Sequence, residues 1–219
     1  ITSIVKELTD DTQLLILLNP NNPMGNVYTE EEFKTLLGIA KQKNIIVLVD
    51  EAYHYFYPNT FIKYALEDEH VFVTRTFSKL FSLAGCRLGY VAGWPEGVKL
   101  IQKLCTPHNT NAFAMKFAEA IIKNPDVLNS LISNFNEGRK YLIDSLDVHG
   151  YRHKGEAGNF IFIKTSTNAD KIVARMKAEK KILIKSYPNV GDFGTCLRVS
   201  IGEKKYMQQF FEALLELDK

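Results

Sequence analysis

The sequence predicts an α/β fold, in which a mainly parallel sheet is followed by a smaller α+β unit. Three observations support this prediction. The first half of the chain alternates continuous apolar runs with a helical pattern, as chains that form parallel sheets do. Those apolar runs end in turn-forming or polar residues, and beyond about residue 105 the pattern changes. We therefore expect two domains, residues 1–120 and 121–219.

The first half contains four predicted strands and one strongly marked helix. Its first apolar run, LLILL, is typical of a strand buried on both faces and is followed by the turn NPNNPMG. Thr29 and Glu32 form a capping box, after which apolar residues recur at helical spacing as far as Ala40. The strands are expected at residues 14–18, 45–49, 71–76 and 88–93.

The second half predicts a long helix that starts at Pro125, because proline suits the first position of a helix. A second helix is expected at about residues 169–180, and a final amphipathic helix carries Tyr206 and Leu217. The strand candidates are NFIFIK (159–164), ILIKSY (182–187) and CLRVSIG (196–202).

Composition excludes several classes of function. The chain has 219 residues, 46% of them hydrophobic, and a net charge of +2, which is ordinary for a globular protein. Evenly spread lysines give no nucleic-acid footprint, and no apolar run is long enough to cross a membrane. Three widely spaced cysteines indicate reduced thiols in a cytoplasmic protein, without metal-ligand spacing. Because the chain begins with isoleucine, we expect a piece of a longer protein.

One stretch collects cations without acidic neighbours. TRTFSKLFSLAGCRLGY (residues 74–90) holds one lysine and two arginines, and no acidic residue occurs between Glu69 and Glu96. A buried cation without a partner is costly. We therefore expect an anion from outside the polypeptide to bind this stretch.

Polar side chains also follow the ends of the predicted strands, where open α/β sheets bind ligands. Taken singly, such residues are common in turns, caps and exposed surfaces. Together they fit a pyridoxal phosphate site. Lys79, with its charge disfavoured by desolvation among aromatic side chains and by nearby arginines, would be an amine able to form a Schiff base. Asp50 would pair with a protonated ring nitrogen and Tyr53 would bind a ring oxygen. The phosphate would be held by Thr76, Ser78 and Arg87.

At these residues the sequence resembles the fold-type-I pyridoxal phosphate aminotransferases, and within them the histidinol-phosphate aminotransferase-like group. The matching motifs are NPNNPMG (19–25), VDEAY (49–53), TRTFSKLFSLAGCRLGY (74–90) and CLRVSIG (196–202), in the order and at the spacings of that family. The resemblance implies that residues 1–120 belong to the cofactor-binding large domain and residues 121–219 to the small domain. It also implies pyridoxal 5'-phosphate as cofactor, an amino acid and a 2-oxo acid as substrates, and a homodimer.

The resemblance gives each matching residue a role. Lys79 corresponds to the lysine that binds the cofactor covalently and moves the proton, and Asp50 to the partner of the ring nitrogen. Arg198 corresponds to the arginine that pairs with the substrate's α-carboxylate. The donors to the ring oxygen correspond to Tyr53 and Asn22, of which Asn22 also borders the substrate. The remaining cofactor contacts are Ala52 on one face of the ring and Thr76, Ser78 and Arg87 on the phosphate.

The sequence departs from the family at two motif positions. Met24 stands where the family usually has threonine, and Lys185 where histidinol-phosphate enzymes commonly have an arginine for the substrate's phosphate. Family members are also longer and carry an N-terminal phosphate-binding loop. We therefore expect this chain by itself to be weakly active or inactive, with an exposed sheet edge. Two alternatives stay open: an amino acid decarboxylase of the same family, and a folded fragment without catalytic activity.

Overall fold

The computed structural model describes residues 1–107, 109–155 and 157–219. The chain divides into two compact units, Ile1–Pro125 and Asp126–Lys219, and each contains one four-stranded sheet. The boundary expected after residue 120 would fall inside helix α5 (Ala112–Ile122). The assignment of these units to a large and a small domain stays a prediction.

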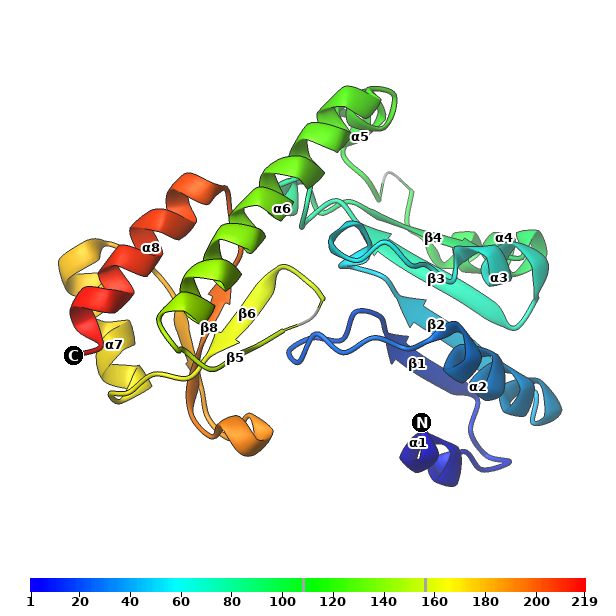
Figure 1. The fold of residues 1–219 in the computed structure, drawn as a ribbon. Coiled ribbons are helices and arrows are strands. Elements are labelled where there is room, and N and C mark those ends of the chain that lie inside the picture. The colour runs from blue at the N-terminus through cyan, green and yellow to red at the C-terminus, as the bar shows by residue number, and fades with distance from the viewer. Residues whose placement is uncertain (108, 156) are drawn as a thin grey trace. The chain divides into compact units, whose positions relative to one another are not determined.

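The first unit is built on a sheet with the strand order β1-β2-β3-β4 (Figure 1). β1, β2 and β3 run parallel, whereas β4 pairs with β3 antiparallel, so the prediction of a mainly parallel sheet is confirmed. β2 and β4 each begin one residue later than expected. The strands are β1 (Leu14–Leu18), β2 (Ile46–Asp50), β3 (Val71–Thr76) and β4 (Gly89–Gly93).

One face of this sheet is covered by α2 (Glu30–Gln42) and α3 (Ile62–Glu67). α2 begins at the predicted capping box, in which Thr29 Oγ1 accepts from the Glu32 amide at 3.1 Å and the Glu32 carboxylate accepts from the Thr29 amide at 2.9 Å. The helices bury their apolar sides against alternate residues of the strands, as the period of two in a strand requires. The strand residues in this core are Leu17, Val47, Val49, Val71 and Val73.

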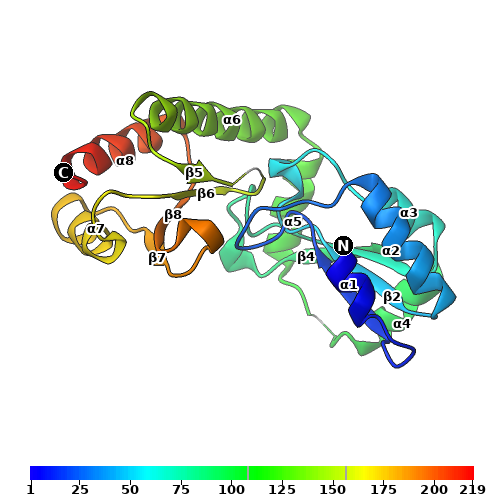
Figure 2. The same cartoon turned by 60° about the horizontal axis from the view of Figure 1, so that its bottom comes forward.

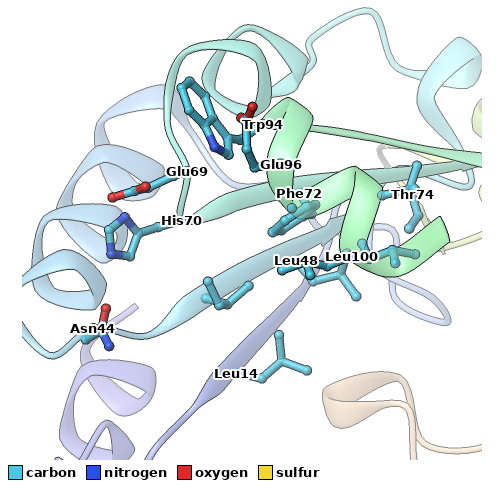
Figure 3. Close-up of a pocket in the computed structure, with 14 residues that line it drawn as sticks. Leu14, Asn44, Leu48, Glu69, His70, Phe72, Thr74, Trp94, Glu96 and Leu100 are labelled. Carbon is cyan, nitrogen blue, oxygen red and sulfur yellow. The ribbon is translucent and has the colours of Figure 1, made fainter. Parts of the chain in front are cut away.

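The opposite face of the sheet is only partly covered by described residues. α4 (Pro95–Leu104) lies against it, and a cavity of about 810 Å³ remains between the helix and the strands (Figure 3). Leu14 and Ile16 of β1 are 48% and 53% exposed. The expectation that the first strand is buried on both faces is therefore wrong. β1 is an edge strand, and no described element covers this face of it.

Four helices of the first unit were not predicted. α1 (Thr2–Glu7) and α3 have six residues each, too few to show a helical period. α5, with the sequence AFAMKFAEAII, is apolar nearly all round and therefore has no clear amphipathic stripe. α4 begins with proline at its first position, which is the local signal for this helix.

The second unit has an antiparallel sheet with the strand order β5-β6-β8-β7. The strands are β5 (His153–Lys154), β6 (Phe160–Ile163), β7 (Lys185–Tyr187) and β8 (Cys196–Ser200). The three predicted helices are confirmed as α6 (Pro125–Val148), α7 (Ala169–Arg175), which continues as a π-helical turn over Met176–Lys180, and α8 (Lys204–Leu217). β7 is shorter than predicted, and β5 was not predicted.

In the second unit, α6 packs closely against the backbone that follows β8. Figure 2 shows α6 running along one side of the sheet. A Cβ atom on Gly138 of this helix would lie 1.9 Å from the carbonyl oxygen of Gly202, in the segment after β8. Only glycine allows the helix to approach that backbone so closely.

In the part of the chain that the structure describes, we find no helix whose length and apolarity would allow it to cross a membrane.

Candidate active site

The carboxyl ends of β2 and β3 place two of the predicted residues at the same end of the sheet. The two strands are parallel, with Asp50 opposite Thr74, so Asp50 and Thr76 lie at the same edge of the sheet. Asp50 is half-buried, and its Oδ1 accepts a hydrogen bond from the Ala52 amide at 3.0 Å. Among the described residues this carboxylate has no ion-pair partner, so it can accept a charged donor from a ligand.

The loops after the two strands bring Lys79 to Tyr53. The Lys79 Nζ atom lies 5.5 Å from the centroid of the Tyr53 ring, and Tyr53 is 5% exposed. Lys79 has no carboxylate partner within the described residues, but its side chain is exposed. The expected desolvation of Lys79 among aromatic side chains is therefore not found. Phe77 and Phe81 pack against each other, with ring centroids 5.0 Å apart, and both are buried.

Hydroxyl and amide groups gather directly after β3. The Thr76 hydroxyl lies 2.9 Å from Ser78 Oγ and accepts from the Ser78 amide at 3.1 Å. The segment that carries Arg87 returns to this point, because the Phe77 amide donates to the Leu88 carbonyl at 3.1 Å. The structure thus places two hydroxyls next to each other and returns the backbone beside Arg87 to the same point; hydroxyl and guanidinium donors suit an oxyanion.

Arg87 has an unusual backbone conformation for a residue with a side chain. It caps a short 3₁₀ turn with φ of 51°, in the left-handed region, and its Nη1 donates to the Ala84 carbonyl at 3.1 Å. Its side chain is exposed and has no acidic partner in the described parts of the chain. A guanidinium held in this way offers further donors to a phosphate.

The turn that contains Asn22 is attached to the end of β2. The Asn19 amide donates to the Asp50 carbonyl at 2.9 Å, and the Asn19 side chain accepts from the Tyr28 amide at 2.9 Å. Asn22 itself is exposed. The structure therefore joins the turn that contains Asn22 to Asp50 through Asn19, and the role of Asn22 toward a ring oxygen stays a prediction.

One cation of the acid-free stretch does have a carboxylate partner. Arg75 Nε and Nη2 lie 2.9 and 2.8 Å from Glu51 Oε2, so the expectation that this stretch lacks internal partners is wrong for Arg75. This pair is not evident in the sequence because the two residues are 24 positions apart and meet only when β2 and β3 pair. The sequence does contain one hint. Two acidic residues, Asp50 and Glu51, stand together at the end of a buried strand, and only Asp50 has an expected role in the site.

Arg198 lies in the second unit, on β8. It is half-buried, and its guanidinium carbon lies 4.1 Å from the centroid of the Phe160 ring and 5.8 Å from that of Tyr187. Stacking on aromatic faces fixes the plane of the guanidinium. Lys185 on β7 is directly opposite Arg198, so two cations share one face of the sheet.

The 810 Å³ cavity lies away from these residues. It is bordered by the amino ends of β1 and β2, by Phe72 of β3 and by Leu100 of α4, and none of the predicted site residues lines it (Figure 3). Its walls are mostly apolar. Within the described ranges, no group of three or more histidine, cysteine, aspartate or glutamate side chains is arranged to hold a metal ion.

Comparison with known proteins supports the resemblance seen in the motifs. Histidinol-phosphate aminotransferase 2 of Hydrogenovibrio crunogenus is 30% identical over 217 residues, which make up 97% of this chain and 57% of that relative. The chain thus spans less than two thirds of the length of this relative.

Solved structures of two such proteins share the fold. The histidinol-phosphate aminotransferase from Clostridium acetobutylicum superposes with a TM-score of 0.84 at 25% identity, over 95% of this chain and 65% of that chain. The enzyme from Sinorhizobium meliloti, in complex with pyridoxal-5'-phosphate, superposes with a TM-score of 0.81 at 24% identity, over 99% of this chain and 59% of that chain. These likenesses confirm the predicted fold class.

The family model described as aminotransferase class I and II matches residues 1–214. Since this match covers nearly the whole sequence, the chain belongs to the aminotransferase class I and II family.

Proposed function

We propose that this chain carries the pyridoxal phosphate site of an aminotransferase that moves an amino group between an amino acid and a 2-oxo acid. The observation that supports it best is the grouping of Asp50, Lys79 and the Thr76–Ser78 loop at the carboxyl ends of two parallel strands. Ligands of open α/β sheets bind at that edge. The alternatives, a decarboxylase of the same family and a chain without catalytic activity, are outcomes of the experiment below.

The residues present fit this cofactor. Asp50 offers a half-buried carboxylate that has no ion-pair partner among the described residues and would bind the protonated ring nitrogen. Lys79, next to the buried Tyr53 ring, offers the amine that would bind the cofactor covalently. The phosphate would take its hydrogen bonds from the loop after β3, from Thr76, Ser78 and Arg87.

Each side chain then has a definite task. Bound there, pyridoxal phosphate would supply an electron-accepting ring that makes the α-hydrogen of an amino acid acidic. Asp50 keeps the ring nitrogen protonated by accepting its hydrogen bond. Tyr53 and Asn22 donate to the ring oxygen. The amine of Lys79 would take the proton from the substrate's α-carbon as a base and deliver it to the cofactor as an acid.

The second unit supplies the substrate's anion contacts in this proposal. Arg198 would pair with the α-carboxylate in a planar, two-point contact, since its guanidinium is already oriented by the Phe160 ring. Like charges directly opposite each other in a sheet repel. The pair of Lys185 and Arg198 would therefore be stabilised by an anionic substrate. We propose a phosphorylated amino donor of the histidinol phosphate type, in which a phosphate takes the place of the α-carboxylate as the group that Arg198 would bind. The carboxylate contact would then serve the 2-oxo acid.

We further propose that the protein is cytoplasmic and acts as a homodimer, as the family resemblance implies. Large apolar side chains of α5 agree with an interface: Phe113 is 78% exposed and Phe117 60% exposed. Light scattering during size-exclusion chromatography would measure the mass, and a monomer at micromolar concentration would contradict the dimer.

A single-turnover reaction tests the function. The chain is loaded with pyridoxal phosphate, mixed with histidinol phosphate, and analysed after hours for pyridoxamine phosphate, so that weak activity is detected. We expect pyridoxamine phosphate up to one equivalent, and none from Lys79→Ala. Threonine O-phosphate is tested in parallel. Release of CO₂ without pyridoxamine phosphate would favour the decarboxylase, and no product from a loaded chain would contradict catalysis.

A further inference from the structure

Glu51 lies at the centre of a buried polar cluster beside the proposed cofactor site. Its side chain is fully buried, and its carboxylate accepts from the Thr60 hydroxyl at 2.7 and 2.8 Å and from the Phe61 amide at 2.7 Å. Arg75 donates to the same carboxylate and also to Thr60 Oγ1 at 2.7 Å. The Arg75 side chain is only 10% exposed.

This cluster joins three segments that carry the proposed cofactor contacts. Glu51 follows Asp50 directly, and Arg75 precedes Thr76 directly, so their ion pair connects the ends of β2 and β3. The Phe61 amide lies ten positions after Glu51 in the chain. The hydrogen bonds to Glu51 therefore close the loop that carries Tyr53.

Backbone contacts show that the ion pair of Glu51 and Arg75 lies directly beyond the paired parts of β2 and β3. The Glu51 amide donates to the Thr74 carbonyl at 2.9 Å, so the ion pair continues the strand pairing by one further residue past its end. A shift of Glu51 relative to Arg75 would therefore move Asp50 relative to Thr76.

We propose that Glu51 and Arg75 are positioning residues: their buried ion pair sets the distance between the ring-binding groups Asp50 and Tyr53 and the phosphate-binding group Thr76. This inference rests on the proposed function, and neither residue of the pair touches the cofactor in it. Arg75 is not a phosphate ligand here, because its guanidinium donors are already directed at Glu51, Thr60 and Tyr90.

A positioning role can be distinguished from simple stabilisation of the fold by comparing two ligands, pyridoxal and pyridoxal phosphate. Pyridoxal uses only the ring contacts, whereas pyridoxal phosphate uses the ring and phosphate contacts together. If the ion pair of Glu51 and Arg75 sets the distance between the ring contacts and the phosphate contacts, its loss should weaken the binding of pyridoxal phosphate more than the binding of pyridoxal. Glu51→Gln should therefore lower the ratio of the affinity for pyridoxal phosphate to the affinity for pyridoxal by about tenfold or more. A tenfold change corresponds to about 1.4 kcal/mol.

The test measures both dissociation constants by absorbance titration, at a temperature where circular dichroism shows each variant folded. Arg75→Lys is the second variant, since it keeps the charge and loses the planar fork, and we expect it to lower the ratio as well. Lys41→Met is the matched control: it breaks the ion pair of Lys41 with Asp68, 2.7 Å in length, which precedes the amino end of β3 and not its carboxyl end. It should leave the ratio unchanged.

Two results would overturn the inference. The first is a ratio that stays the same in Glu51→Gln and Arg75→Lys while only the melting temperature falls. The second needs no cofactor: hydrogen exchange at the Glu51 and Phe61 amides should become at least about tenfold faster in Glu51→Gln, and unchanged exchange would contradict the role of the pair. If the unaltered chain binds no pyridoxal phosphate, the proposed function fails, and the exchange rates still decide whether the pair holds the strand ends.

Discussion

Asp50→Asn separates the chemistry of the carboxylate from its place in the fold. The change keeps Oδ1, so the hydrogen bond from the Ala52 amide, 3.0 Å long, is preserved. Because Asp50 has no ion-pair partner among the described residues, no salt bridge is lost. We expect the free energy of unfolding to change by less than about 0.5 kcal/mol, as for substitutions that touch no special feature.

The same change removes a charged partner of the ring nitrogen. A hydrogen bond to a charged group contributes about 1.5–3 kcal/mol. This corresponds to a loss of about tenfold to hundredfold in affinity for pyridoxal phosphate. Absorbance titration gives the dissociation constant, and chemical denaturation gives the stability.

The exposed Asp11 provides the control, because Asp11→Asn makes the same chemical change away from the site. Its affinity for pyridoxal phosphate should equal that of the unaltered chain. Equal affinity in Asp50→Asn would refute the assignment of Asp50 to the ring nitrogen. A large loss of stability in that variant would show that Asp50 serves the fold instead.

Three further predictions concern the fold, the substrate and the pH dependence. Gly138→Ala should destabilise the second unit by about 3 kcal/mol, because its Cβ would meet a backbone oxygen at 1.9 Å. The control is Gly38→Ala, which has open space around it and should stabilise the chain by up to about 1 kcal/mol. Chemical denaturation measures both changes. Arg198→Ala should raise KM for the amino donor with little effect on cofactor binding, whereas loss of cofactor would contradict the carboxylate role. Burial, and after it repulsion by the neighbouring arginine, lowers the pKa of His54 from its ordinary 6.5, while Glu51 opposes the shift. The folded state therefore prefers neutral His54. The contribution of His54 to the free energy of unfolding should be fully present above pH 6.5 and should decline as the pH falls below 6.5. A pKa of His54 at or above 6.5 in an NMR titration would contradict this.

Much of the sheet could be predicted because its strands are continuous apolar runs with clear ends. The capping box at Thr29 and Pro125 at the start of the long helix also acted through local chemistry, which is visible in a short window. Burial of both faces of β1 was predicted wrongly. A run such as LLILL shows that its side chains are apolar, but not which neighbouring elements cover them.

The candidate site shows the same limit. The residues of the loop after β3 are close in sequence, and the hydrogen bond between Thr76 and Ser78 follows from that closeness. The pair of Glu51 and Arg75 depends on two strands meeting side by side, so charge spacing along the chain could not reveal it. Exposure of Lys79 likewise depends on how the loop folds, and neighbouring phenylalanines in sequence did not bury it.

Covalent capture of the cofactor tests the central claim most directly. The chain is incubated with pyridoxal phosphate, reduced with borohydride, digested and mapped by mass spectrometry, with Lys79→Ala treated in parallel. The account predicts a phosphopyridoxyl group on the Lys79 peptide and no single modified site in Lys79→Ala. A folded chain that is modified at other lysines, or not at all, would contradict it.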